Sequence, residues 1–107
     1  MVSDQGLYQI SQGLKRLSSL KSLSFDFSFC NGITDIALSH LAKALKRLIS
    51  LQKINLRCDL NNQITDVGVE KIGKSLKNLA LLQILKLNFA GCKKIKDSIR
   101  IRNFCQN

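Results

Sequence analysis

Apolar and acidic residues recur along this sequence with a fixed 31-residue period, so they fall into columns when matching positions are aligned. The columns are Val2/Ile33/Ile64/Ile95, Asp4/Asp35/Asp66/Asp97, Leu14/Leu45/Leu76, Leu17/Leu48/Leu79, Leu20/Leu51/Leu82 and Leu23/Ile54/Leu85. A fixed period carried by apolar residues predicts one supersecondary unit, stacked so that each copy buries the open face of its neighbour. We therefore expect a single domain of 107 residues with units at 2–32, 33–63 and 64–94 and a partial unit at 95–107, and a place within a longer array.

The first half of each unit has helical periodicity. Thr34 and Asp35 precede apolar residues at three- and four-residue spacings, and such short polar residues are typical of a helix start. The pattern predicts helices near 5–17, 36–48 and 67–79, with a further short helix near 97–105. The apolar residues expected to face the core are Leu7, Ile10, Leu14 and Leu17 in the first helix, Ile36, Leu38, Leu41, Leu45 and Leu48 in the second, and Val67, Val69, Ile72, Leu76 and Leu79 in the third.

The second half of each unit alternates with period two, which is typical of a strand with one apolar face. In the first unit, Leu23, Phe25, Phe27 and Phe29 alternate with Ser22, Ser24, Asp26 and Ser28. The pattern predicts strands near 22–28, 53–59 and 84–90. A strand–helix–strand connection is a right-handed crossover, so these strands should pair in parallel. The expected fold is an α/β, right-handed solenoid of 31-residue units, with a parallel sheet on its concave face and helices on its convex face.

The strand segments LKSLSF, LQKINL and LQILKL also follow an apolar pattern close to L-x-x-L-x-L, and Cys30, Asn61 or Cys92 comes after each. Together with the I-T-D segments at 33–35 and 64–66, this motif resembles the leucine-rich repeats of the ribonuclease-inhibitor-like class. One departure is an extra residue pair before the Cys or Asn, which should lengthen the strand without reversing its faces. Such long units look like the large repeat families of ciliates and other protists, which often accompany protein kinase or other signalling domains. Asn61 is expected to bond the backbone of neighbouring turns, a structural role that Cys fills more weakly.

Composition limits the classes of function. No run is long enough for a membrane span and the N-terminus does not look like a signal peptide, so a cytoplasmic location is expected, with a nuclear one as the alternative. The four cysteines show no metal-like pairing, and His40 is the single histidine. No nucleotide-binding, hydrolase or metalloprotease motif occurs. We expect no enzyme activity, no cofactor and no metal.

The net charge of +10 is the strongest feature outside the repeat. Stacked helices would align basic residues in the columns Lys15/Lys46/Lys77, Arg16/Arg47/Asn78, Gln12/Lys43/Lys74 and Gln9/His40/Lys71. Such a ridge could attract phosphates, so nucleic acid or an anionic membrane is one alternative partner. Exposed helix positions also favour Lys and Arg for helix propensity and solubility alone, and no aromatic residues interleave the basic ones. Nucleic acid is therefore not the partner we expect.

The polar strand face is the candidate binding surface, because solenoids bind other proteins through their extended concave surfaces. Asp26 and Arg57 should be cross-strand neighbours on this face. The residues expected to contact a protein partner are Lys53, Asn55, Arg57, Asp59, Lys86 and Asn88. The expected function is a non-catalytic protein-interaction module. The other alternative is a structural spacer within a larger signalling protein of the protein-kinase type.

Overall fold

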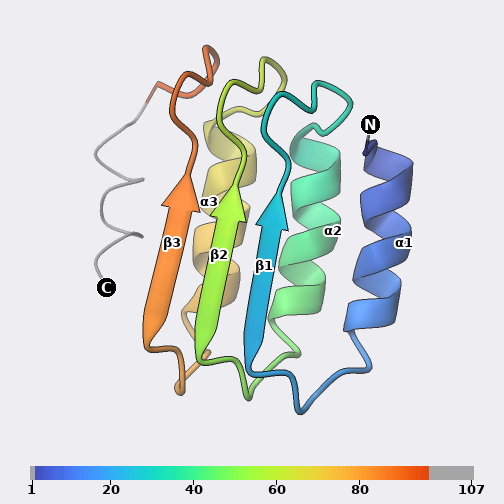
Figure 1. The fold of residues 1–107 in the computed structure, drawn as a ribbon, viewed down its shortest axis with the longest axis vertical. Helices are drawn as coiled ribbons and strands as arrows, with labels where there is room; N and C mark the ends of the chain where they lie inside the picture. Colours follow the sequence, from blue (N-terminus) through green and yellow to red (C-terminus); the bar gives the residue numbers. More distant parts are fainter. Residues whose placement is uncertain (1, 97–107) are drawn as a thin grey trace.

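The structure, a computed structural model, describes residues 2–96 as two layers, with three helices packed on one face of a three-stranded sheet (Figure 1). The elements are α1 (Asp4–Leu14), β1 (Ser22–Asp26), α2 (Asp35–Leu45), β2 (Lys53–Arg57), α3 (Asp66–Leu76) and β3 (Ile84–Asn88). The strand order is β1-β2-β3 and both pairings are parallel, as the crossover argument predicts. The short helix expected near 97–105 lies outside the described residues.

The strands pair with an offset of one repeat unit, so the sequence columns are also columns in space. Leu23 lies opposite Ile54, and Ile54 lies opposite Leu85. The strands end at Asp26, Arg57 and Asn88, two residues before the predicted ends. The pairing nevertheless continues, because the Phe27 amide donates to the Arg57 carbonyl at 2.7 Å. The alternation of faces continues with it, and Phe27, Cys58 and Phe89 are all buried.

Helices α2 and α3 each begin at a side-chain cap that also joins two units. Thr34 caps α2 by accepting the Ile36 amide at 3.2 Å. The Thr34 amide and hydroxyl in turn donate to the two carboxylate oxygens of Asp4, each at 2.7 Å. Asp35 accepts the same pair of bonds from Thr65 at the start of α3. The recurring aspartates therefore hold each helix start against the next, across 30 residues of sequence.

The helices end at Leu14, Leu45 and Leu76, three residues before the predicted ends. Beyond them the chain forms successive tight turns rather than continuing the helix. The Leu48 amide donates to the Leu45 carbonyl at 3.0 Å, and the Leu51 amide donates to the Leu48 carbonyl at 3.1 Å. These turns carry a leucine at every third position, and in sequence that spacing is indistinguishable from another helical turn.

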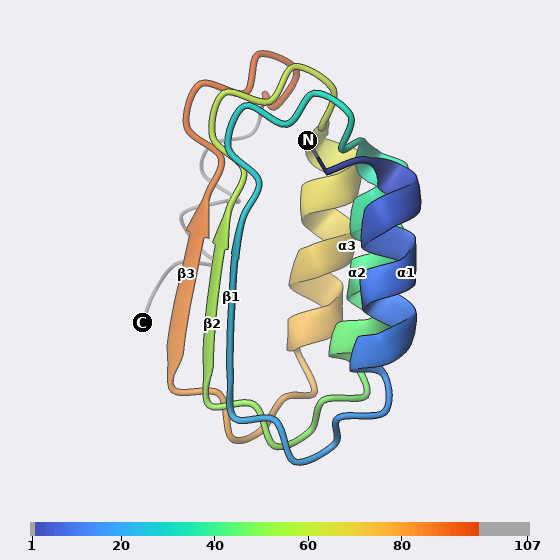
Figure 2. The ribbon, with the colours of Figure 1, turned by 45° about the vertical axis from the view of Figure 1, so that its right-hand side comes forward.

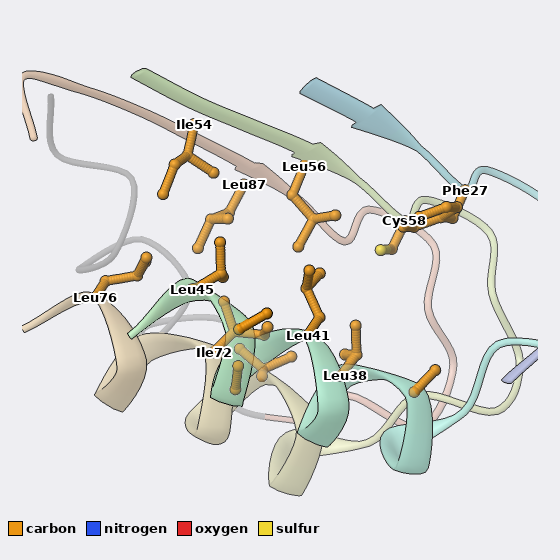
Figure 3. Close-up of a cluster of buried hydrophobic side chains, with 14 of the residues drawn as sticks. Phe27, Leu38, Leu41, Leu45, Ile54, Leu56, Cys58, Ile72, Leu76 and Leu87 are labelled. Atoms are coloured by element: carbon orange, nitrogen blue, oxygen red, sulfur yellow. The ribbon is translucent and has the colours of Figure 1, made fainter. Parts of the chain in front are cut away.

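The core lies between the helices and the sheet. Ile54, Leu56 and Leu87 project from the strands toward Leu41 and Leu45 of α2 and Ile72 of α3 (Figure 3). Four residues of the predicted helices, expected to face this core, are instead exposed: Ile10 (40%), Leu17 (49%), Ile36 (63%) and Val67 (55%).

The four exceptions have two causes. Ile36 and Val67 are the second residues of α2 and α3, and the helical turn places them on the side away from the sheet. Ile10 and Leu17 belong to the first unit, where α1 has a described neighbour, α2, on one side only (Figure 1).

Candidate functional site: the open sheet face

The helices cover one face of the sheet, and no element within residues 2–96 covers the other (Figure 2). We call this uncovered side the open sheet face; its strand residues are Ser22, Ser24, Asp26, Lys53, Asn55, Arg57, Ile84, Lys86 and Asn88. Strand parity assigns these residues to it, because their neighbours in sequence form the apolar inner face. The open sheet face corresponds to the surface predicted to be concave.

The six residues expected to contact a partner lie together on this surface. Asn55 is in register with Lys86, and Arg57 is in register with Asn88. Lys53 occupies the first position of β2, and Asp59 lies one row beyond the strand end. The side chains of Asn55 and Asp59 are half-buried, and the other four are exposed. Asn88, one of these four, already uses its side-chain oxygen within the chain, where it accepts the Ala90 amide at 2.9 Å.

A polar cluster forms where β1 and β2 end. The Ser28 hydroxyl lies 2.6 Å from a carboxylate oxygen of Asp26 and 2.6 Å from one of Asp59, and its single proton can be donated to either. Arg57 donates to the other Asp59 oxygen at 3.2 Å. Asp26 and Arg57 are in register, as expected, but the guanidinium bonds Asp59 of its own segment rather than Asp26 across the pair.

This cluster fixes the charge of the carboxylates. The Ser28 hydroxyl lowers the pKa of both Asp26 and Asp59, because a hydrogen bond to the ionised form favours that form. Both side chains are therefore ionised at neutral pH. Lys53 is the first residue of β2 and Lys86 is the middle residue of β3, so the open sheet face is basic over its first and middle rows and acidic toward the strand ends.

The structure reveals a column that the sequence patterns did not identify. Phe29, Leu60 and Gly91 have φ angles of 64°, 60° and 74°, in the left-handed region that disfavours non-glycine residues. The alternation predicts Phe29 on the apolar strand face, but this backbone turns its side chain outward, where 62% of it is exposed. Leu60 is 46% exposed and lies directly over Gly91, where a Cβ atom would overlap it. The glycine at 91 was the available sequence signal for this conformation.

Asn61 has the structural role that the motif predicts. Its side chain is fully buried, and its amide nitrogen donates to the carbonyls of Cys30 and Ile33 at 2.8 and 2.9 Å. Its side-chain oxygen accepts the amides of Gln63 and Ile64 at 2.6 and 2.9 Å. Cys92 makes one comparable bond, from its thiol to the Cys58 carbonyl at 3.0 Å. Asn61 therefore ties the loop that ends the second strand to the loop that ends the first.

Cys58, Cys92 and His40 belong to chemically reactive residue types, and each packs against other residues. Burial raises the pKa of the Cys58 and Cys92 thiols, which keeps them protonated and poorly nucleophilic. His40 is half-buried and meets the Tyr8 ring edge-on, with ring centres 4.7 Å apart. Among residues 2–96, no three side chains of metal-ligating type come together.

No helix in this part of the chain is long and apolar enough to cross a bilayer. Comparison with known proteins adds no relative: no protein-family model matches the chain, and no curated protein matches it either.

Proposed function

We propose that this chain is a leucine-rich-repeat solenoid of the ribonuclease-inhibitor-like class, and that it acts as a non-catalytic module binding a protein partner through the open sheet face. The observation that carries the proposal is that the inner face of the strands keeps the same apolar chemistry from unit to unit, whereas the outer face does not. Leu23, Ile54 and Leu85 form one column of the inner face, whereas Ser22, Lys53 and Ile84 beside them differ in chemistry and face outward.

The surface offers both parts of a typical protein interface. Apolar anchors with polar groups around them are characteristic of interfaces in which a few residues carry most of the affinity. Phe29 and Leu60 supply exposed apolar groups at the strand ends, held outward by an unusual backbone. Arg57 supplies a planar donor group at the end of β2, oriented by its ion pair with Asp59.

The charge distribution defines the partner that fits. Lys53 and Lys86 form no ion pair within the described part of the chain, so they are available to carboxylates of a partner. The ionised side chains of Asp26 and Asp59 lie near the strand ends. A partner with acidic groups over the first and middle rows and an apolar side chain near the strand ends would complement this surface.

Site-specific photocrosslinking tests the proposal. A photoreactive residue at position 55 should capture one specific protein, because Asn55 is at the centre of the open sheet face. The same residue at position 78, an exposed helix-side position, is the matched control and should not capture it. The captured protein, once purified, should bind the Lys53→Glu/Lys86→Glu variant at least about tenfold more weakly than the unmodified chain.

The control for charge is the Lys43→Glu/Lys71→Glu variant, which makes the same net change on the helix side and should retain binding of that protein. The proposal is wrong if the helix-side variant loses binding and the sheet-face variant keeps it. Absence of any capture specific to position 55 would favour the spacer alternative.

A further inference from the structure

The interface between α2 and α3 contains a basic cleft on the side of the helices away from the sheet. The cleft has a volume of about 260 Å³. Its lining residues are Ser39, Ala42, Lys43 and Lys46 from α2 and its C-cap, and Lys71 and Lys74 from α3. We call it the α2/α3 cleft. Four ammonium groups and one hydroxyl border it, and its only small apolar side chain is Ala42.

The corresponding part of the α1/α2 interface is partly filled by aromatic side chains. Tyr8 and His40 occupy, one unit earlier, the repeat positions of Ser39 and Lys71, and their rings pack against each other with centres 4.7 Å apart. Gln12, which occupies the repeat position of Lys43, donates to the Tyr8 hydroxyl at 2.7 Å. The aromatic pair closes only its own part of the α1/α2 interface, and a separate cleft lined by Gln12, Lys15, Arg16 and Arg47 remains open there. Replacement of both rings by Ser39 and Lys71 leaves the corresponding part of the α2/α3 interface open and basic.

General properties of helices account for only part of this charge. Lys43, Lys46 and Lys74 lie in the last turns or at the C-cap, where cations complement the helix dipole. Lys71 lies in the middle of α3, where that explanation does not apply. Lys74 has a carboxylate partner, Glu70, at 3.7 Å.

The other three lysines form no ion pair within residues 2–96. Like charges that share a cleft repel one another, and a bound anion removes that repulsion.

We propose that the α2/α3 cleft binds a compact anion that carries several clustered phosphate groups. Lysine ammonium groups bind phosphate as point charges, and Ser39 can add a hydroxyl donor. The small volume matches a headgroup-sized ligand rather than a large apolar one. Such a group occurs both as a soluble polyphosphate and as the headgroup of a phosphoinositide lipid. This site is separate from the open sheet face and does not depend on the function proposed for it.

Calorimetric titration of the full chain with inositol trisphosphate is the direct test. We expect a dissociation constant of about 10 to 100 μM at low salt, and loss of most of the affinity at high salt, because the lysines are solvent-exposed. The Lys43→Glu/Lys71→Glu variant should bind at least about 30-fold more weakly. The milder Lys43→Gln/Lys71→Gln variant should show a smaller loss in the same direction, and thermal denaturation should show both variants folded.

Two controls separate this cleft from the general positive charge. The Lys53→Glu/Lys86→Glu variant makes the same net change on the open sheet face and should lose less than about threefold in affinity. The Arg16→Glu/Arg47→Glu variant alters a second, wider cleft of about 520 Å³ between α1 and α2, and it should also lose less than about threefold. Equal losses in all three charge-reversed variants would overturn the proposal, because binding would then follow net charge alone.

Vesicles distinguish the sources of the phosphate group. Binding to phosphatidylcholine vesicles that contain phosphatidylinositol bisphosphate, in addition to the free headgroup, would assign the ligand to a membrane surface. Binding to the free headgroup alone would assign it to a soluble polyphosphate, and either result supports the cleft. A chain that binds duplex DNA but not inositol trisphosphate would contradict the proposal.

Discussion

The first and second units carry matching leucines but bury them differently. Leu17 is 49% exposed, whereas Leu48, its equivalent in the next unit, is fully buried. Ile10 is 40% exposed, whereas Leu41 in the same column is 1% exposed. The second unit packs between α1 and α3, and α1 packs against α2 alone. Membership of an apolar sequence column therefore shows which residues can be buried. Whether such a residue is buried depends on how many neighbouring units cover its own unit.

The largest expected effect is a difference between two identical substitutions. Leu48→Ala should lower the free energy of unfolding by about 2 to 5 kcal/mol, because it leaves a cavity in a covered core. Leu17→Ala should lower it by less than about 1 kcal/mol, because the side chain is already half in solvent. Urea denaturation of both variants measures the difference. Equal losses would mean that the second unit is no better covered than the first.

Asn61 and Cys30 provide a similar comparison between polar residues of one column. Asn61→Ala should destabilise the protein by about 2 to 3 kcal/mol or more, because it removes four hydrogen bonds and leaves buried backbone groups unsatisfied. Cys30→Ala should have an effect of less than about 1 kcal/mol, because Cys30 is only half-buried. Chemical denaturation checks both values. A loss at Asn61 no larger than that at Cys30 would show that the bonds of Asn61 do not join the two loops.

Gly6 and Gly68, the third residues of α1 and α3, should respond in opposite directions to the same change. Gly68 lies where α3 approaches α2, and a Cβ atom there would overlap the carboxylate of Asp35. Gly68→Ala should therefore destabilise the protein by about 1 to 3 kcal/mol. Gly6 has ordinary space around it, with the nearest atom to such a Cβ at 3.7 Å.

Gly6→Ala should accordingly stabilise the protein by about 0.5 to 1 kcal/mol through helix propensity. Thermal and urea denaturation of the two variants give the sign of each change. The close packing of α3 on Asp35 would be refuted if both glycines tolerated alanine equally well.

The smallest expected effect concerns the hydroxyl that links the two units at the strand ends. Ser28 lowers the folded-state pKa of Asp26 and Asp59, so the stabilisation is present above the ordinary aspartate value of about 4 and is lost as the pH falls through the folded-state values. Ser28→Ala should raise the pKa of both carboxyl groups toward that ordinary value. Carboxyl-carbon NMR titration measures both groups directly, and unchanged titration curves would mean that the hydroxyl does not contact them.

The repeat period predicts the register and the place of Asn61, and the strand–helix–strand order predicts the parallel pairing, because the sequence displays both the offsets and the order directly. The same pattern places the helix ends three residues too late, since leucines in three-residue turns have the same spacing as a helical stripe. The exposure of Ile10 and Leu17 could not follow from column membership, which does not depend on how many neighbours a unit has.

The candidate site was predictable to a similar degree. Strand parity placed Lys53 and Lys86 on the open sheet face, and the structure has them there. The choice of Asp59 over Asp26 as the partner of Arg57 depends on side-chain rotamers, for which the sequence pattern carries no information. The outward turn of Phe29 depends on a left-handed backbone that few aromatic residues adopt, so a period-two pattern could not predict it.

The central claim is that each repeat unit lies parallel to the next with matching residues side by side, since the open sheet face and the α2/α3 cleft both depend on that arrangement. Nuclear Overhauser contacts between backbone protons of neighbouring strands test it most directly. Contacts in parallel geometry should connect Ser24 to Asn55 and Asn55 to Lys86. Close Hα–Hα contacts typical of antiparallel pairs, or contacts at another offset, would contradict it.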